Sequence, residues 1–183
     1  MAGYPIEPDK LLDAADRLAP VRTGPGRPPY TAHRRAVSTA YYAVFHAITE
    51  RVAAIVFPSA DDAFQRRIRR WIGHGDIRTV ARWVSQLKGT SSGSPPPHIQ
   101  QLLAPGGSQL LDLITFFLAD GFLELNDKRE QADYDHDAVF TRPDTRGHIA
   151  LAKAVVATAQ TVDNLPTRCF YGLIGLQARI QNR

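Results

Sequence analysis

The chain has 183 residues, of which 44% are hydrophobic and 22% are charged, and its formal net charge is +4 at pH 7. These values exclude a disordered or fibrous chain and predict one globular domain over residues 1–183, with a positive charge compatible with a polyanionic partner. The single cysteine, Cys169, excludes an intramolecular disulfide and a thiolate zinc site, and neither a signal peptide nor an apolar span of roughly 18 residues is found, so we expect a cytoplasmic protein without a membrane partner.

Helical periodicity recurs between breaks rich in proline and glycine, whereas strand signals are scarce. We therefore predict an all-α fold, an up-and-down helical bundle with an extra C-terminal helix. The predicted helices cover residues 8–18, 31–57, 60–72, 76–87, 150–162 and 168–181, together with a long helix that starts near 105–108 and continues into a polar segment near residue 129.

The second predicted helix is the best defined. Tyr42, Phe45, Val52 and Ile55 recur at helical spacing, interspersed alanines permit close helix approach, and Pro58 ends the pattern. We expect this helix to be central. Ser59 is the predicted N-cap of the helix that follows.

The second half of the chain contains two predicted breaks. Residues 89–107, rich in Gly, Ser and Pro, are expected to form a flexible insertion, and residues 136–147, which include Pro143, are expected to form a loop. The core is predicted over residues 9–162, and residues 166–183 are predicted to form a helical extension.

A polar segment from Asn126 to His136 follows directly on an apolar run. If the helix continues through it, Arg129, Asp133 and His136 lie at about 0°, 40° and −20° around the axis, on one face. Arginine offers a planar fork of donors to phosphate oxygens, and histidine exchanges protons near neutral pH. The trio is a candidate site for a phosphodiester, although Arg129 and Asp133 also fit an ordinary i, i+4 ion pair at a solvated helix end.

Basic residues gather elsewhere as well. The densest block of arginines is typical of either a phosphate-facing surface or a solvated helix face. Lys128 is a further cation, within the polar segment. The block consists of Arg66, Arg67, Arg69 and Arg70.

Two segments together resemble a known pattern. Residues Arg35–Ala47, which read RAVSTAYYAVFHA, are similar to the RAYYAxFHA helix of the HEPN family (higher eukaryotes and prokaryotes nucleotide-binding domain), in particular its small stand-alone bacterial members. Residues Arg129–Asp135 match the RxxADYD signature of that branch, and His74 falls where these proteins often carry a histidine that opens the intervening helix. The resemblance covers roughly residues 9–162 and is carried by these segments.

The resemblance implies a chemistry. Active HEPN proteins carry Arg, then four to six residues, then His, and are metal-independent endoribonucleases whose sites form at a homodimer interface. The spacing of Arg129 and His136 meets this pattern. The resemblance thus implies Arg129, His136 and Asp133 as catalytic residues, with RNA as substrate and no metal or other cofactor, in a toxin–antitoxin or antiphage system. The residues expected to contact RNA phosphates are Arg66, Arg67, Arg69, Arg70 and Lys128.

Other interpretations stay open. The chain could be a non-catalytic nucleotide- or partner-binding module that accompanies a minimal nucleotidyltransferase-type antitoxin, or a structural dimer in which Arg129 and Asp133 lock adjacent helices. Two further Arg–His pairs, Arg69 with His74 and Arg142 with His148, also have a suitable spacing.

Overall fold

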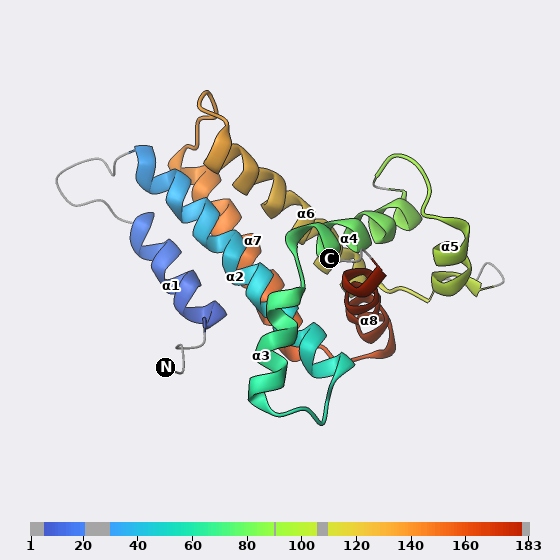
Figure 1. The fold of residues 1–183 in the computed structure, drawn as a ribbon. Coiled ribbons are helices and arrows are strands. Elements are labelled where there is room, and N and C mark those ends of the chain that lie inside the picture. Colours follow the sequence, from blue (N-terminus) through green and yellow to red (C-terminus); the bar gives the residue numbers. More distant parts are fainter. Residues whose placement is uncertain (1–5, 21–29, 90, 106–109, 181–183) are drawn as a thin grey trace.

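The computed structural model describes residues 6–20, 30–89, 91–105 and 110–180 (Figure 1). These residues form eight helices and no strand, which confirms the all-α prediction for the part of the chain described. The helices are α1 (Pro8–Leu18), α2 (Tyr30–Val56), α3 (Asp62–Trp71), α4 (His74–Lys88), α5 (Pro97–Leu103), α6 (Leu113–Tyr134), α7 (Arg142–Thr161) and α8 (Leu165–Ile180).

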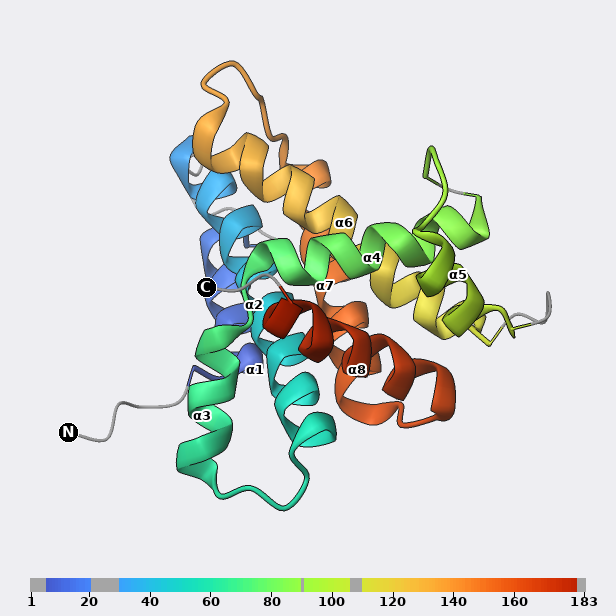
Figure 2. The same cartoon turned by 45° about the vertical axis from the view of Figure 1, so that its right-hand side comes forward.

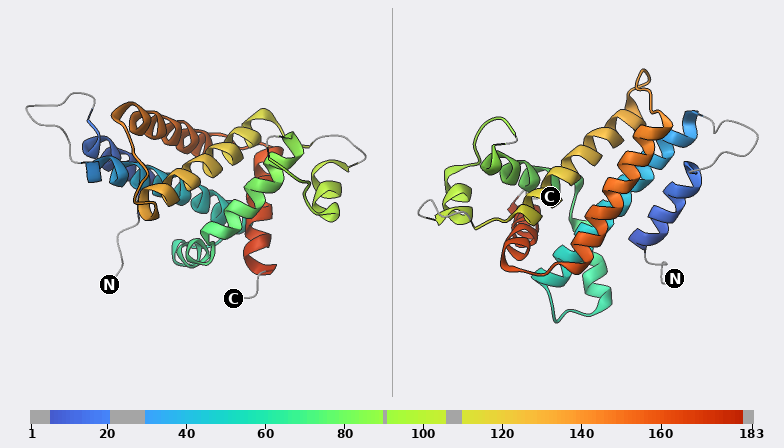
Figure 3. Two further views of the ribbon diagram at one scale, coloured as in Figure 1. Left: turned by 90° about the horizontal axis from the view of Figure 1, so that it is seen from above. Right: turned by 180° about the vertical axis from the view of Figure 1, so that it is seen from behind.

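Helix α2 is central, as its pattern predicts. It packs against α1, α3, α6, α7 and α8, and small residues such as Ala36, Ala40 and Ala47 are completely or almost completely buried on it. Helices α1 and α6 run in one direction and α2 and α7 in the other, in an up-and-down arrangement (Figure 1 and Figure 3, right). Small side chains let these helices approach closely.

Close approach also explains a glycine inside α6. A Cβ atom at Gly121 would lie 2.6 Å from Cγ2 of Val155 on α7, which is closer than real Cβ contacts. A side chain there would force the two helices apart or distort a well-packed core. Gly121 therefore sets the contact between α6 and α7.

Helices α4 and α8 cover the remaining side of α6 and the C-terminal half of α2 (Figure 2). On α8, Phe170, Tyr171 and Ile174 are completely buried in the main core. The C-terminal segment, expected to be an extension, is thus part of the core. No helix among the described residues is long and apolar enough to span a membrane.

Several helix boundaries differ from the prediction because side-chain caps decide where a helix begins. Helix α3 is capped by Asp61, whose carboxylate accepts a hydrogen bond of 2.7 Å from the Phe64 amide, and not by Ser59. Helix α6 begins at Leu113, where Asp112 caps the Thr115 amide at 2.8 Å, rather than near 105–108. Residues 106–109, which overlap the start predicted for α6, lie outside the described part of the chain.

Two predicted breaks contain helix. Thr141 and Asp144 form a reciprocal capping box, so α7 already begins at Arg142, and Pro143 lies in its first turn, where a missing amide proton costs nothing. The expected loop over 136–147 was therefore too long. Within the expected insertion at 89–107, α5 buries Ile99 and Leu103.

Candidate functional site

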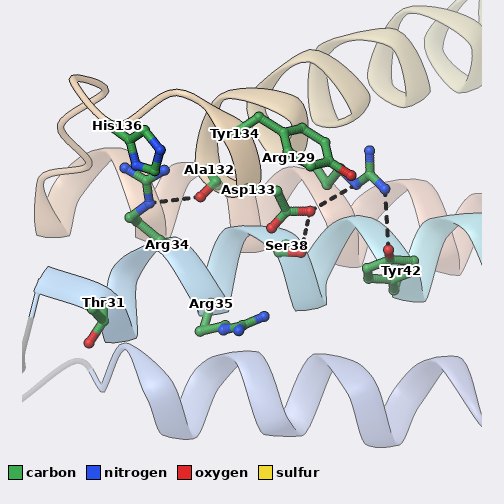
Figure 4. A pocket seen from close by; sticks show the side chains of 10 residues that line it. All are labelled: Thr31, Arg34, Arg35, Ser38, Tyr42, Arg129, Ala132, Asp133, Tyr134 and His136. Atoms are coloured by element: carbon green, nitrogen blue, oxygen red, sulfur yellow. Dashed lines mark hydrogen bonds and ion pairs between the residues drawn. The ribbon is translucent and has the colours of Figure 1, made fainter.

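A pocket of about 480 Å³ lies between the N-terminal half of α2 and the C-terminal end of α6 (Figure 4). It contains three arginines, one carboxylate and one imidazole among polar neighbours, so its cations outnumber its anions. The lining residues are Thr31, Arg34, Arg35, Ser38, Tyr42, Arg129, Ala132, Asp133, Tyr134 and His136.

Arg129 is held by several contacts within the chain. Its Nε atom lies 3.0 Å from Oδ2 of Asp133, and its Nη2 atom donates a hydrogen bond of 3.3 Å to the hydroxyl of Tyr42. The guanidinium carbon also lies 5.6–5.8 Å from the ring centroids of Tyr41, Tyr42 and Tyr134. Only 14% of the side chain is exposed. Burial opposes its charge, but the Tyr42 hydroxyl and Asp133 outweigh this and raise the pKa of Arg129 above its usual value.

Asp133 connects α6 to α2. Its Oδ2 atom accepts a hydrogen bond of 3.3 Å from the Ser38 hydroxyl in addition to its ion pair with Arg129, and 21% of its side chain is exposed. The i, i+4 ion pair that the sequence allowed is therefore present. The pair lies within α6, and hydrogen bonds from its two side chains to Ser38 and Tyr42 connect it to α2.

His136 is exposed and lines the same pocket, but not on the predicted helix face. Helix α6 ends at Tyr134 with Asp135 as its C-cap, so His136 belongs to the turn that follows. In Figure 4 it lies near Arg34, on the far side of Asp133 from Arg129, and no bond joins it to Arg129. The expectation that one helical face carries all three residues was wrong because the helix ends first.

Arg34, which the sequence analysis did not single out, determines this end. Its guanidinium donates hydrogen bonds of 2.7 Å to the carbonyl oxygen of Ala132 and 2.8 Å to that of Asp135, and longer ones to those of Gln131 and Ala138. The last carbonyls of a helix have no intrahelical partner, and a cation beside them is favourable. Arg34 thus caps α6 and holds the turn that carries His136.

The sequence does contain a signal for the α2 side of the pocket. Thr31, Arg35, Ser38 and Tyr42 follow one another at steps of four, three and four, a polar stripe along one helix face. Arg35 is exposed, and no ion pair or hydrogen bond of its side chain is found within the described residues. It is therefore available to an anionic ligand.

A half-buried histidine lies behind Arg129. His74, which opens α4, stacks on Phe45 with ring centroids 4.0 Å apart, and its Nδ1 atom lies 2.6 Å from the hydroxyl of Tyr41. Burial lowers the pKa of His74, and the positive charges of Arg129 and His46 lower it further. Tyr41 is buried, which raises the pKa of its phenol. At neutral pH the hydroxyl can thus donate to an uncharged imidazole.

The predicted phosphate contacts lie outside this pocket. Arg66, Arg67 and Arg70 are exposed on α3, while Arg69 is paired with Glu50 at 2.9 Å. Lys128 donates a hydrogen bond to Gln131 and lines a different pocket of about 880 Å³ between α6 and α7.

The alternative Arg–His pairs do not converge on the pocket. Arg69 is engaged by Glu50 and His74 by Tyr41, and His148 lies 3.7 Å from a carboxylate oxygen of Glu124 on the α7 side. None of these residues lines the pocket at Arg129. Among the described residues, no group of three or more His, Cys, Asp or Glu side chains is placed to hold a metal ion.

Comparisons of the chain with protein-family models, with curated proteins and with solved structures give no match. The site must therefore be interpreted from its own geometry and from the sequence motifs.

Proposed function

We propose that this protein is a cytoplasmic member of the HEPN family that acts on RNA as a metal-independent endoribonuclease of a toxin–antitoxin or antiphage system. The observation that supports this proposal best is that Arg129 and His136 line one pocket together with Arg34 and Arg35. Three guanidinium groups suit the phosphate backbone of a nucleic acid. The exposed imidazole supplies a group that can move protons.

In the proposed reaction, Arg129 binds the scissile phosphate. Arginine has five N–H donors, and Asp133 and Tyr42 engage only Nε and Nη2, so further donors remain for phosphate oxygens. These two contacts orient the guanidinium before RNA arrives. A preoriented cation stabilises the negative charge that develops on the phosphoryl oxygens in the transition state.

His136 would act on the neighbouring ribose. Its imidazole accepts the proton of the 2′-hydroxyl as the 2′-oxygen bonds to phosphorus, and the bond from phosphorus to the 5′-oxygen breaks. The departing 5′-oxygen takes a proton from water and His136 returns its proton to the solvent, which gives a 2′,3′-cyclic phosphate and a 5′-hydroxyl end.

The proposal includes a homodimer in which two such pockets face one another. Large side chains near the end of α6 favour an interface there, since Tyr134, which lines the pocket, is 70% exposed and Val139, in the segment after α6, is 72% exposed. Aromatic and apolar residues are typical of the centre of interfaces. A second subunit would cover these residues and bring two copies of His136 close to the same RNA.

A second candidate is a non-catalytic module that binds a nucleotide or a partner such as a nucleotidyltransferase-type antitoxin. The burial of Arg129 against Asp133 within one subunit favours it, because the guanidinium already has a structural role. In this case the pocket would bind a phosphate through Arg35, since the five N–H donors of Arg34 already have partners, and would not cleave it.

Incubation of purified protein with RNA in EDTA separates the two candidates. We expect the wild type to cut and His136→Ala to lose about 10²-fold or more of the rate, since general acid–base catalysis contributes at least this much. His98→Ala is the matched control, because His98 is exposed on α5 and does not line the pocket.

Arg129→Ala is expected to abolish cutting as well, and its circular dichroism must remain that of the wild type for the result to count. Equal cutting by all variants would assign the activity to another site or a contaminant. Binding of RNA or nucleotide without any cutting would favour the non-catalytic module.

A further inference from the structure

Helix α3 carries an unusual surface. It contains four arginines and one aspartate, a net charge of +3 in ten residues, and none of its residues is buried. Arg66, Arg67 and Arg70 are exposed, and no ion pair of these three is found among the described residues. Trp71, the last residue of the helix, is 67% exposed.

These four residues lie next to one another on the helix. With about 100° per residue, Trp71, Arg67, Arg70 and Arg66 follow in this order around the axis over an arc of about 140°. Ile68 lies outside this arc, about 60° beyond Trp71, and packs against the main core. The outward face of α3 therefore presents the flat indole of Trp71 beside three unpaired cations.

The indole of Trp71 borders a narrow crevice. The crevice is also lined by Val52 of α2, Ile68 of α3 and Ala178 of α8. Tryptophan has two rotatable side-chain bonds, so it loses little rotational freedom when a ligand stacks on its exposed part.

The surface is connected to the pocket along α2. Tyr42, which contacts Arg129, and Glu50, which pairs with Arg69 of α3, are separated by eight residues of α2, or about 12 Å of helix and about 80° around its axis. Helix α3 itself lies at the edge of the molecule beside the C-terminal half of α2 (Figure 2). A single strand that enters the pocket can extend to α3.

We propose that the outward face of α3 is a binding surface for single-stranded RNA, on which Trp71 stacks against a base while Arg66, Arg67 and Arg70 contact the phosphates. This inference rests on the proposed function and extends its substrate to a strand unpaired beyond the cut site. Stacking on an aromatic side chain beside a cationic track is how proteins bind single strands without sequence preference.

An acidic membrane surface is the other polyanion that a basic helix could bind. A membrane-surface helix turns its apolar face outward toward the lipid. In α3 the aliphatic Ile68 faces the core, and the ring of Phe64, which is 41% exposed, packs against Phe57 at 5.1 Å. The exposed face thus offers two aromatic side chains and three arginines, and no large aliphatic side chain. This arrangement favours RNA.

The chain allows a direct optical test, since its two tryptophans are Trp71 and Trp83. In a Trp83→Phe variant, all tryptophan fluorescence comes from Trp71. Addition of an oligouridylate of about 12 nucleotides should quench it, because a base stacks on the indole, and an abasic oligomer of equal length and charge should not. Equal quenching by both oligomers, or a blue shift with phosphatidylserine vesicles and no quenching by RNA, would overturn the proposal.

Binding measured by fluorescence anisotropy of labelled RNA gives a second readout. Trp71→Ala should weaken binding about tenfold, and Trp71→Phe should recover most of it. The double variant Arg67→Ala/Arg70→Ala should lower the slope of log affinity against log salt by about 1.4. Leu113→Ala is the control for loss of an exposed apolar side chain, since Leu113 is 80% exposed at the start of α6, and it should bind like the wild type.

The two proposals fail in different ways. If Trp71→Ala binds RNA as the wild type does while the wild type cuts RNA, the stacking surface is wrong and the proposed activity stands. If RNA quenches Trp71 but no cutting occurs in EDTA, the stacking surface stands and the endoribonuclease is wrong.

Discussion

Arg129 shows how the contacts that stabilise a buried cation also fix its orientation. A buried guanidinium is costly unless a carboxylate and further hydrogen bonds surround it, and removal of one partner leaves an uncompensated charge. Asp133 and Tyr42 provide these contacts, and three tyrosine rings surround the guanidinium carbon. The same contacts fix the orientation of the guanidinium. These distances establish a structural role for Arg129, and the cleavage assay tests the proposed catalytic role.

At the residue scale, His74 makes stability depend on pH. Its pKa is lowered in the folded state from the usual 6.5, so the unfolded chain binds more protons below that pH. The contribution of His74 is complete above about pH 6.5 and is lost as the pH falls below it. Between about pH 7.5 and pH 5, we expect the free energy of unfolding of the wild type to fall by more than that of His74→Phe, which keeps an aromatic ring against Phe45.

Urea unfolding at the two pH values measures this difference. His98→Gln removes an exposed histidine on α5 and should keep the wild-type pH dependence. His148, whose pKa is also lowered by burial, remains in both proteins and contributes equally to each. His46 remains as well, but its charge interacts with that of His74, so the measured difference reports on the two histidines together. An identical pH dependence in wild type and His74→Phe would show that His74 is not held neutral by the fold.

At the scale of elements, the end of α6 depends on a side chain from α2. Arg34 donates hydrogen bonds to four carbonyl oxygens of the last turn of α6 and the residues after it. Val37, Ala132 and Phe140 form a small separate apolar cluster that packs beneath this turn. The position of His136 is therefore set by contacts between elements rather than by α6 alone.

Two adjacent arginines provide a matched test of this cap. Arg34→Ala should lower the free energy of unfolding by about 2 kcal/mol, since it leaves several helix-end carbonyls without a charged donor. Arg35→Ala should change it by less than about 0.5 kcal/mol, because Arg35 is exposed and has no partner within the described residues.

Urea unfolding measures both values, and hydrogen exchange of amides 131–138 should accelerate in Arg34→Ala alone. Equal stability of the two variants would mean that the turn after α6 is stable without the hydrogen bonds of Arg34.

At the scale of the whole molecule, α8 completes the core. Phe170, Tyr171 and Ile174 are fully buried, and a Cβ at Gly175 would lie 2.8 Å from Cγ2 of Val56, so α8 approaches α2 very closely. Loss of a single large core side chain costs about 2–5 kcal/mol, and total stabilities are about 5–15 kcal/mol. Loss of α8 should therefore unfold the rest of the domain.

We therefore expect that a chain ending at residue 164 does not unfold cooperatively on heating. Thermal melts followed by circular dichroism, together with the dispersion of amide signals in NMR spectra, measure this. Leu176→Ala is the control on α8, since Leu176 is 54% exposed, and it should melt cooperatively. A sharp transition in the truncated chain would show that α8 is an independent addition.

The sequence by itself determined the helical class, the central place of α2 and the polar stripe that lines the pocket. Periodicity and prolines act locally, and every residue needed to recognise them is adjacent in the chain. Capping was harder to foresee, because several polar residues near 59–62 and 105–112 could fill the same position and packing chose among them.

Only the tertiary structure decided how Arg129 and His136 lie relative to each other. Local periodicity allowed α6 to continue through His136, but Arg34, 98 positions before Ala132, binds the helix-end carbonyls and stabilises the turn instead. The burial of Arg129 could not be predicted from the sequence either. Two of the tyrosines that enclose it belong to α2, which the fold brings alongside α6. Long-range contacts of this kind have no signature in the residues on either side of a site, and they determine which groups a ligand can reach.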